Sequence, residues 1–107
     1  AAGAFGAHAL AARLTPERLA TWETAARYHM YHSLGLLLVA ALAARWPSGS
    51  LLNVAGWLFV AGIIVFCGTV YALALGAPRW FGAITPLGGL AFIAGWILLA
   101  VAAARSA

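Results

Sequence analysis

Charge is nearly absent from this sequence of 107 residues: only 7% of the residues are charged, and neither lysine nor aspartate occurs. Soluble domains carry roughly a quarter charged residues, so this chain has too few polar groups to cover a water-soluble fold. The missing aspartate excludes an Asp-based catalytic triad and a paired-aspartate mechanism. The single cysteine, Cys67, excludes an internal disulfide and cannot form a metal site by itself.

The few charges that do occur are scattered along the chain. All six basic residues are arginines, Glu17 and Glu23 are the only acids, and the net charge is +4. The arginines do not gather on one face, so we expect no nucleic-acid partner. Arg45, Arg79 and Arg105 each end an apolar run, where an arginine anchors a helix among lipid headgroups.

Apolar residues make up most of the chain. They account for 65% of it, and the mean hydropathy is +0.99. The apolar runs are continuous, unlike the alternating segments of about ten residues that form a barrel. Helices are then the spanning structure that pairs every backbone polar group. We therefore predict an all-α integral membrane protein, a small transmembrane helical bundle in contact with the lipid bilayer.

Turn and capping residues divide this single membrane domain, residues 1–107, into segments. Thr15-Pro16-Glu17 predicts a helix start, and nothing breaks the helix before residues 46–50. Ser50 is expected to cap the next helix, and Gly76-Ala77-Pro78 to end it. The expected segments are a helix end and connection (1–14), an amphipathic interfacial segment (15–27) and three spans (28–45, 51–75 and 86–104).

The start of the last span is open to two interpretations. Thr85-Pro86 repeats the cap-plus-proline pattern and predicts a helix that begins at Pro86. Alternatively, a helix begins near Phe81 and Pro86 kinks it. Close helix contacts are expected at small residues and at this proline: Gly68, Ala72, Pro86, Gly88, Gly89, Ala91 and Gly95.

The densest chemistry lies between Trp22 and His32. On a helical wheel the polar residues fill two neighbouring stripes: Glu23, Arg27, Tyr31, Thr24, Tyr28 and His32. We expect this polar half to face protein or water, and the half that contains Trp22 and Ala25 to face lipid.

The order of the spans brings several polar residues to one membrane face. The candidate cluster is His8, Glu23, Arg27, Tyr28, Tyr31, His32, Tyr71 and Thr85. The favoured interpretation is an internal hydrogen-bond network, because unpaired buried polar groups are destabilising. A site for a proton, a small ligand or a partner's headgroup is the alternative, because ionisable groups inside membranes often serve function.

Metal and cofactor binding are not expected. His29 and His32 lie one turn apart, but no third ligand follows at a recognisable spacing. The two later spans contain no histidine that could complete a haem pair with His32.

Four stretches, in this order, carry a family resemblance: GAFGAHAL, WETAARYHMYHSLGLL, FCGTVYALAL and ITPLGGLAFIAGW. They resemble the small membrane protein family catalogued as domain of unknown function 423, with transmembrane protein 256 as its animal counterpart. The resemblance covers nearly the whole chain. It implies four transmembrane helices, the second preceded by the interfacial segment. The expected location of the chain is a bacterial inner or plasma membrane.

The resemblance also implies that the first family helix ends at the GAFGAH element, which starts here at Gly3. We therefore expect three complete spans and only the end of the first helix. No activity, substrate or catalytic residue carries over from the family. The residues that match its motifs are His8, Glu23, Tyr28, His32, Thr85, Pro86 and Gly88.

Together these features predict a non-enzymatic structural or accessory subunit of a larger membrane complex. Its partners would be other membrane chains, in a hetero- or homo-oligomer. The alternative is an oligomeric transporter or channel, or a proton or small-ligand site, built on Glu23, Tyr28 and His32. A lipid- or quinone-modifying enzyme is disfavoured because the sequence offers no catalytic set.

Overall fold

A computed structural model describes residues 1–46 and 50–106, and these residues contain helices but no strand. The predicted all-α fold class is therefore confirmed. The segments, in chain order, are α1 (Ala2–Phe5), the π-helical η1 (Gly6–Leu10), α2 (Pro16–Arg45), α3 (Leu51–Gly62), the π-helical η2 (Ile63–Cys67), α4 (Gly68–Ala74) and α5 (Phe81–Ser106). Most of the turn expected at 46–50 lies outside the described residues.

Helix α2 begins where the sequence predicts. The Thr15 hydroxyl accepts a hydrogen bond from the backbone N–H of Arg18 at 3.2 Å, and Pro16 occupies the first helical turn. Thr15 thus satisfies one of the N–H groups that a helix start leaves unpaired. The helix then runs unbroken over 30 residues to Arg45, which confirms the absence of a break.

Segments α3, η2 and α4 follow one another without a gap and form a single helical rod, Leu51–Ala74. Its start differs from the prediction, because the Ser50 side chain makes no capping hydrogen bond and its backbone is already helical. Its end follows the prediction. Gly76 has a φ of 102°, a conformation that a residue with a Cβ rarely adopts, and the chain turns there.

Helix α5 begins at Phe81, so Pro86 lies inside it and not at its start. The expected start at Pro86 is wrong, and the alternative start near Phe81 is correct. The turn before the helix supplies the reason: the backbone N–H groups of Phe81 and Gly82 already bond to the carbonyls of Pro78 and Arg79. Pro86 has no N–H to offer the preceding turn, and the helix continues past it.

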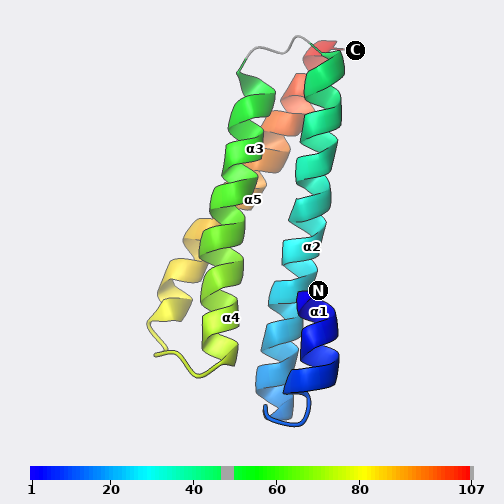
Figure 1. Ribbon diagram of the computed structural model, residues 1–107. Helices are drawn as coiled ribbons and strands as arrows, with labels where there is room; N and C mark the ends of the chain where they lie inside the picture. The colour runs from blue at the N-terminus through cyan, green and yellow to red at the C-terminus, as the bar shows by residue number, and fades with distance from the viewer. Residues whose placement is uncertain (47–49, 107) are drawn as a thin grey trace.

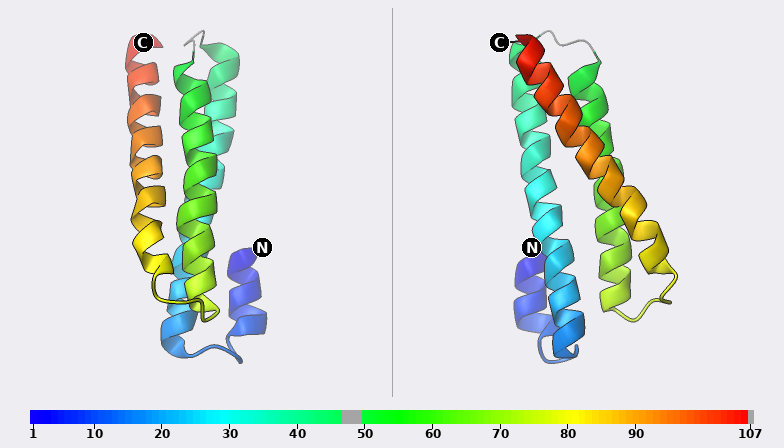
Figure 2. Two further views of the ribbon diagram at one scale, coloured as in Figure 1. Left: turned by 90° about the vertical axis from the view of Figure 1, so that its left-hand side faces the viewer. Right: turned by 180° about the vertical axis from the view of Figure 1, so that it is seen from behind.

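The rods form a flat bundle with extents of 48 × 28 × 14 Å (Figure 1). Helix α2 and the rod Leu51–Ala74 run side by side in opposite directions. Helix α5 crosses one side of this pair diagonally, and α1 with η1 folds back along the first half of α2 (Figure 2). The first half of α2, the end of α4 and the start of α5 therefore share one end of the bundle.

Two helices among the described residues are long and apolar enough to cross a membrane: Leu51–Ala74 and Phe81–Arg105. The span expected at 28–45 lies within α2, is not one of these two, and stays a prediction. The core contains Leu52, Phe59 and Cys67, which are fully buried. Large apolar side chains cover the outside, among them Leu37 at 68% exposure and Trp57 at 67%.

Glycines set how closely the helices approach. A Cβ at Gly88 of α5 would collide with the backbone of Phe66 in η2, and one at Gly95 would lie 2.7 Å from the Phe59 ring. Gly68, in contrast, is exposed, with no atom within 4 Å of such a Cβ, so its expected packing role is wrong. The other predicted packing residues vary: Ala72, Gly89 and Ala91 are half-buried, and Pro86 is exposed.

Candidate functional site

The side of α2 that faces the bundle is only partly the side that the helical wheel indicates: His32 belongs to the polar half, whereas Trp22 and Ala25 belong to the half expected to face lipid. Ala25 is completely buried, His32 is 6% exposed, and Trp22 packs on Tyr71 of α4. Together with His29, which contacts Tyr71, these α2 residues follow the spacing of three and four at which packed helices touch. The expectation that Trp22 and Ala25 face lipid is therefore wrong. Lipid is as apolar as a protein core, so polarity alone does not decide which helix face turns inward.

His32 lies where α2, α3 and α5 meet. Its Nδ1 is 2.7 Å from the backbone carbonyl oxygen of Tyr28, one turn earlier on α2. Its Nε2 accepts a hydrogen bond from the indole N–H of Trp96 in α5 at 3.0 Å. Both ring nitrogens are therefore used inside the chain.

These two partners assign the protonation state of the ring. A carbonyl only accepts, so Nδ1 must carry a proton, and an indole N–H only donates, so Nε2 must keep its lone pair. Both hydrogen bonds can form together only when His32 is neutral and protonated at Nδ1. This is the form in which a histidine is easiest to bury in an apolar environment.

Aromatic rings enclose His32. The Phe92 ring stacks on it with the centroids 3.5 Å apart and the planes 9° apart. Phe59 approaches edge-on at 5.5 Å, and the Trp96 ring lies tilted at 5.8 Å. The side chains that pack on His32 from α3 and α5 are thus aromatic, and none of them is a carboxylate or a second imidazole.

A second polar contact joins α1, α2 and α4. The Trp22 indole N–H donates to the Ala2 carbonyl at 2.9 Å, and its ring lies 4.4 Å from the Tyr71 ring. The Tyr71 hydroxyl lies 3.2 Å from Nδ1 of His29. The Phe5 ring of α1 also packs against Trp22, with the two ring centroids 5.8 Å apart. This contact fixes α1 against the first half of α2.

A third contact joins α4 to α5 through two threonine hydroxyls. Thr69 Oγ1 and Thr85 Oγ1 are 2.6 Å apart. Thr69 also donates to the carbonyl of Val65 at 2.6 Å, which leaves the Thr85 hydroxyl to donate to Thr69. Each hydroxyl has one proton, so this arrangement uses both without conflict.

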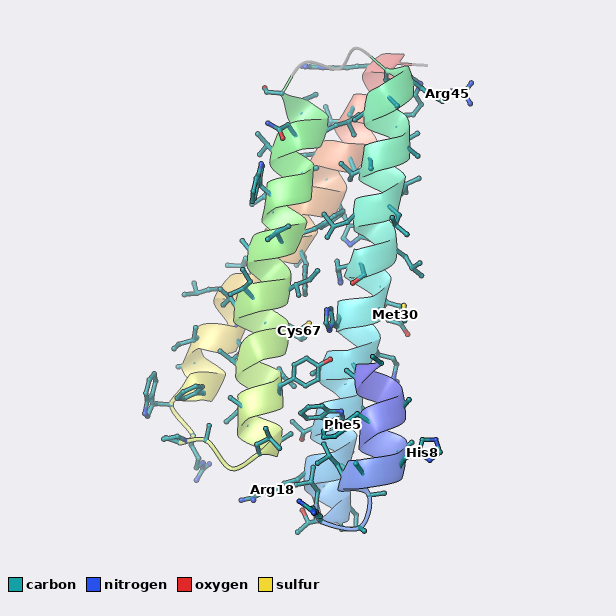
Figure 3. The ribbon with its side chains drawn as sticks, viewed as in Figure 1. Phe5, His8, Arg18, Met30, Arg45 and Cys67 are labelled. Carbon is teal, nitrogen blue, oxygen red and sulfur yellow. The ribbon has the colours of Figure 1, made fainter. Side chains whose placement is uncertain are left out.

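Four members of the predicted cluster do not join these contacts. His8 is exposed and points away from the bundle (Figure 3). Glu23, Arg27 and Tyr31 are exposed on α2, and Glu23 and Arg27 line a groove of about 400 Å³ beside α1 together with Met30. The predicted gathering of one cluster is therefore wrong. Tyr28 is intermediate: its ring stacks on Phe66 at 5.0 Å while 40% of the residue stays exposed.

Sequence reasoning missed His29, which meets Tyr71, and the aromatic residues around His32. One signal was available for Trp96: a buried histidine needs a donor for its second nitrogen, and an indole N–H is donor-only. Trp57 lies on a facing helix as well, however, and it is 67% exposed. Only the helix packing distinguishes the two tryptophans.

The described residues offer no open coordination site. They contain no group of three or more His, Cys, Asp or Glu that could hold a metal ion. Within the same residues, every buried side-chain nitrogen or oxygen atom has a hydrogen-bond partner. A larger groove of about 530 Å³ lies between α2 and α3, and its lining is mostly apolar, with Asn53 as a polar member. The residues that form the hydrogen bonds around His32, Trp22 and Thr69 do not line this groove.

Comparisons with known proteins identify relatives of this chain. The model of the family described as "Protein of unknown function (DUF423)" matches residues 2–89. The chain is 48% identical to the UPF0382 membrane protein YwdK of Bacillus subtilis (strain 168) over 103 residues, which are 96% of this chain and 84% of the relative. It is 46% identical to the UPF0382 membrane protein SH2409 of Staphylococcus haemolyticus (strain JCSC1435) over 99 residues, 92% and 80% of the two chains. No solved structure matches the chain.

Proposed function

The chain belongs to the DUF423 family of membrane proteins, and from this premise we propose that it is a non-enzymatic structural or accessory subunit of a larger membrane complex. The observation that carries the proposal is the division of the polar side chains between two faces of α2. Those on the inner face are paired within the chain, whereas charged groups lie on the outer face.

The charged side chains on the outer face of α2, Glu23 and Arg27, lie alongside apolar helices. Tyr28 stacks on Phe66, which lies about 12 Å inside the end of the apolar rod at a rise of about 1.5 Å per residue. Arg27 is next to Tyr28, so it lies at a similar depth, and it is exposed together with Glu23 and Tyr31. Ionisable groups at membrane depth almost always face protein or water, so a second polypeptide on this face would stabilise them.

The inner face leaves little for chemistry. The polar side chains on this face form hydrogen bonds within the chain: His32, Tyr71, Thr69 and Thr85. A catalytic or transport site needs groups that are free to meet a substrate. The competing transporter or ligand site on Glu23, Tyr28 and His32 has less support, because Glu23 faces outward and His32 is buried.

Site-specific photo-crosslinking in native membranes tests the proposal. A photoreactive amino acid would replace Arg27 or Tyr31 on the outer face of α2. Matched controls would replace Ile93 or Ile97, which are exposed on α5 at 57% each. We expect adducts with another membrane polypeptide from the α2 positions, well above the α5 controls, and co-migration of both chains in native electrophoresis. Migration as a lone monomer, with adducts only to lipid or within the chain, would contradict the proposal.

A further inference from the structure

The bond between His32 and Trp96 depends on one lone pair. Nε2 of His32 accepts the indole N–H at 3.0 Å, while Nδ1 donates to the Tyr28 carbonyl at 2.7 Å. A second proton on the ring would bind at Nε2, because Nδ1 already carries one. Two N–H donors would then point at each other across a hydrogen-bonding distance, and the contact would become repulsive.

We propose that His32 is a proton-binding latch between α2 and α5: when its ring takes up a second proton, the Trp96 indole is released and swings outward. Neutral His32 holds α5 against α2, and removal of the proton closes the latch again. The proposal goes beyond the subunit role, because it makes the fit of α5 in the bundle responsive to pH.

The structure favours movement of Trp96 over movement of His32. The His32 ring is only 6% exposed, it stacks on Phe92 at 3.5 Å, and its bond to the Tyr28 carbonyl survives protonation. A cationic ring over the face of Phe92 also gains a cation–π attraction. Trp96 is 39% exposed, so its indole has room to turn toward the outside of the bundle.

Few titratable groups surround the latch. The side chains packed on His32 are Phe59 from α3 and Phe92 and Trp96 from α5, and none of these titrates. On α2 itself, the Tyr28 ring lies 6.3 Å away, and the neighbouring His29 bonds to Tyr71 of α4. None of these residues is a carboxylate, so no neighbouring anion among them neutralises the positive charge that His32 gains on protonation.

The test follows the Trp96 side chain directly. The intact protein, labelled with 5-fluorotryptophan, is placed in lipid nanodiscs, and fluorine NMR spectra are recorded as the pH is lowered. Trp96→Phe identifies the Trp96 resonance among those of the five tryptophans. We expect this resonance to shift through one reversible transition while the helix content stays constant. The variant His32→Gln, which keeps an acceptor without a titratable ring, should abolish the transition, and His29→Gln should preserve it.

Two outcomes would overturn the proposal. One is a Trp96 resonance that does not respond to pH while nitrogen NMR shows that His32 has gained its second proton. The other is a transition that persists in His32→Gln or disappears in His29→Gln. If His32→Gln does not fold, nitrogen NMR of the unmodified protein decides: the Trp96 transition must coincide with protonation of Nε2 of His32, and a mismatch rejects the latch.

Discussion

The indole nitrogen of Trp96 lies 3.0 Å from Nε2 of His32, a hydrogen bond between residues 64 positions apart. It fixes the tautomer of a buried histidine and joins the second half of α5 to the middle of α2. Among the side-chain hydrogen bonds of the described residues, the next most distant pair, His29 and Tyr71, is 42 positions apart. The effect of removing either partner is therefore a direct measure of how much the inner network stabilises the fold.

Trp96→Phe should lower the free energy of unfolding by roughly 1–2 kcal/mol, because it leaves the buried Nε2 of His32 without a donor. Trp57→Phe is the matched control, since Trp57 is 67% exposed, and it should change stability much less. Equilibrium unfolding in mixed micelles measures both. Equal losses in the two variants would show that the hydrogen bond contributes nothing beyond the loss of ring size.

Gly88→Ala should destabilise the fold, whereas Gly68→Ala should not. A methyl group at Gly88 meets the backbone of Phe66, so α5 must move away from η2, at a cost of about 1–3 kcal/mol. At Gly68 the methyl group enters open space, so the better helix propensity of alanine should leave stability unchanged or raise it by up to about 1 kcal/mol. Thermal unfolding in detergent compares the two. The reverse order would refute the crossing of α5 over η2.

Trp22→Phe should release α1 without unfolding the bundle. It removes the 2.9 Å hydrogen bond to the Ala2 carbonyl while an aromatic ring stays between Phe5 and Tyr71. We expect faster amide hydrogen exchange over residues 2–10 and unchanged exchange in α3 and α5. Trp80→Phe, at an exposed position in the connection before α5, serves as the control. Unchanged protection of residues 2–10 in Trp22→Phe would speak against this anchor.

Thr69 and Thr85 should show a small energetic coupling. A double-mutant cycle with Thr69→Val and Thr85→Val isolates their 2.6 Å contact from the bond that Thr69 donates to the Val65 carbonyl. Side-chain hydrogen bonds between membrane helices average about 0.6 kcal/mol, and we expect a coupling free energy of that size. Strict additivity of the two single variants would mean that the hydroxyls do not stabilise each other.

Much of the fold was predictable because local signals determine helix ends. Thr15-Pro16-Glu17 marks the start of α2, and Gly76 marks the turn after α4, since each position has a requirement that few residue types meet. The start of α5 was less certain: the proline at 86 resembles a first-turn residue, but the preceding turn at Pro78 and Arg79 had already begun the helix.

The site was predictable only in part. Helix order indicates that the first half of α2, the end of α4 and the start of α5 lie at one end of the bundle (Figure 1). It does not indicate which polar residues touch, because Glu23 and His32 both look polar on a wheel, yet one faces out and the other in. Ala25 is completely buried and Gly88 lies against Phe66, but Gly68 shows that a small residue alone does not predict a contact. The partner of His32 came from α5, far away in the sequence.

The most direct test of the inner network is the tautomer of His32. Nitrogen NMR of histidine-labelled protein in lipid bilayers at neutral pH distinguishes protonated from unprotonated ring nitrogens. The structure predicts a protonated Nδ1 and an unprotonated Nε2 for His32, with the Nε2 signal altered in Trp96→Phe. A proton on Nε2 at neutral pH, or a His32 signal that does not respond to loss of the Trp96 indole, would contradict the account.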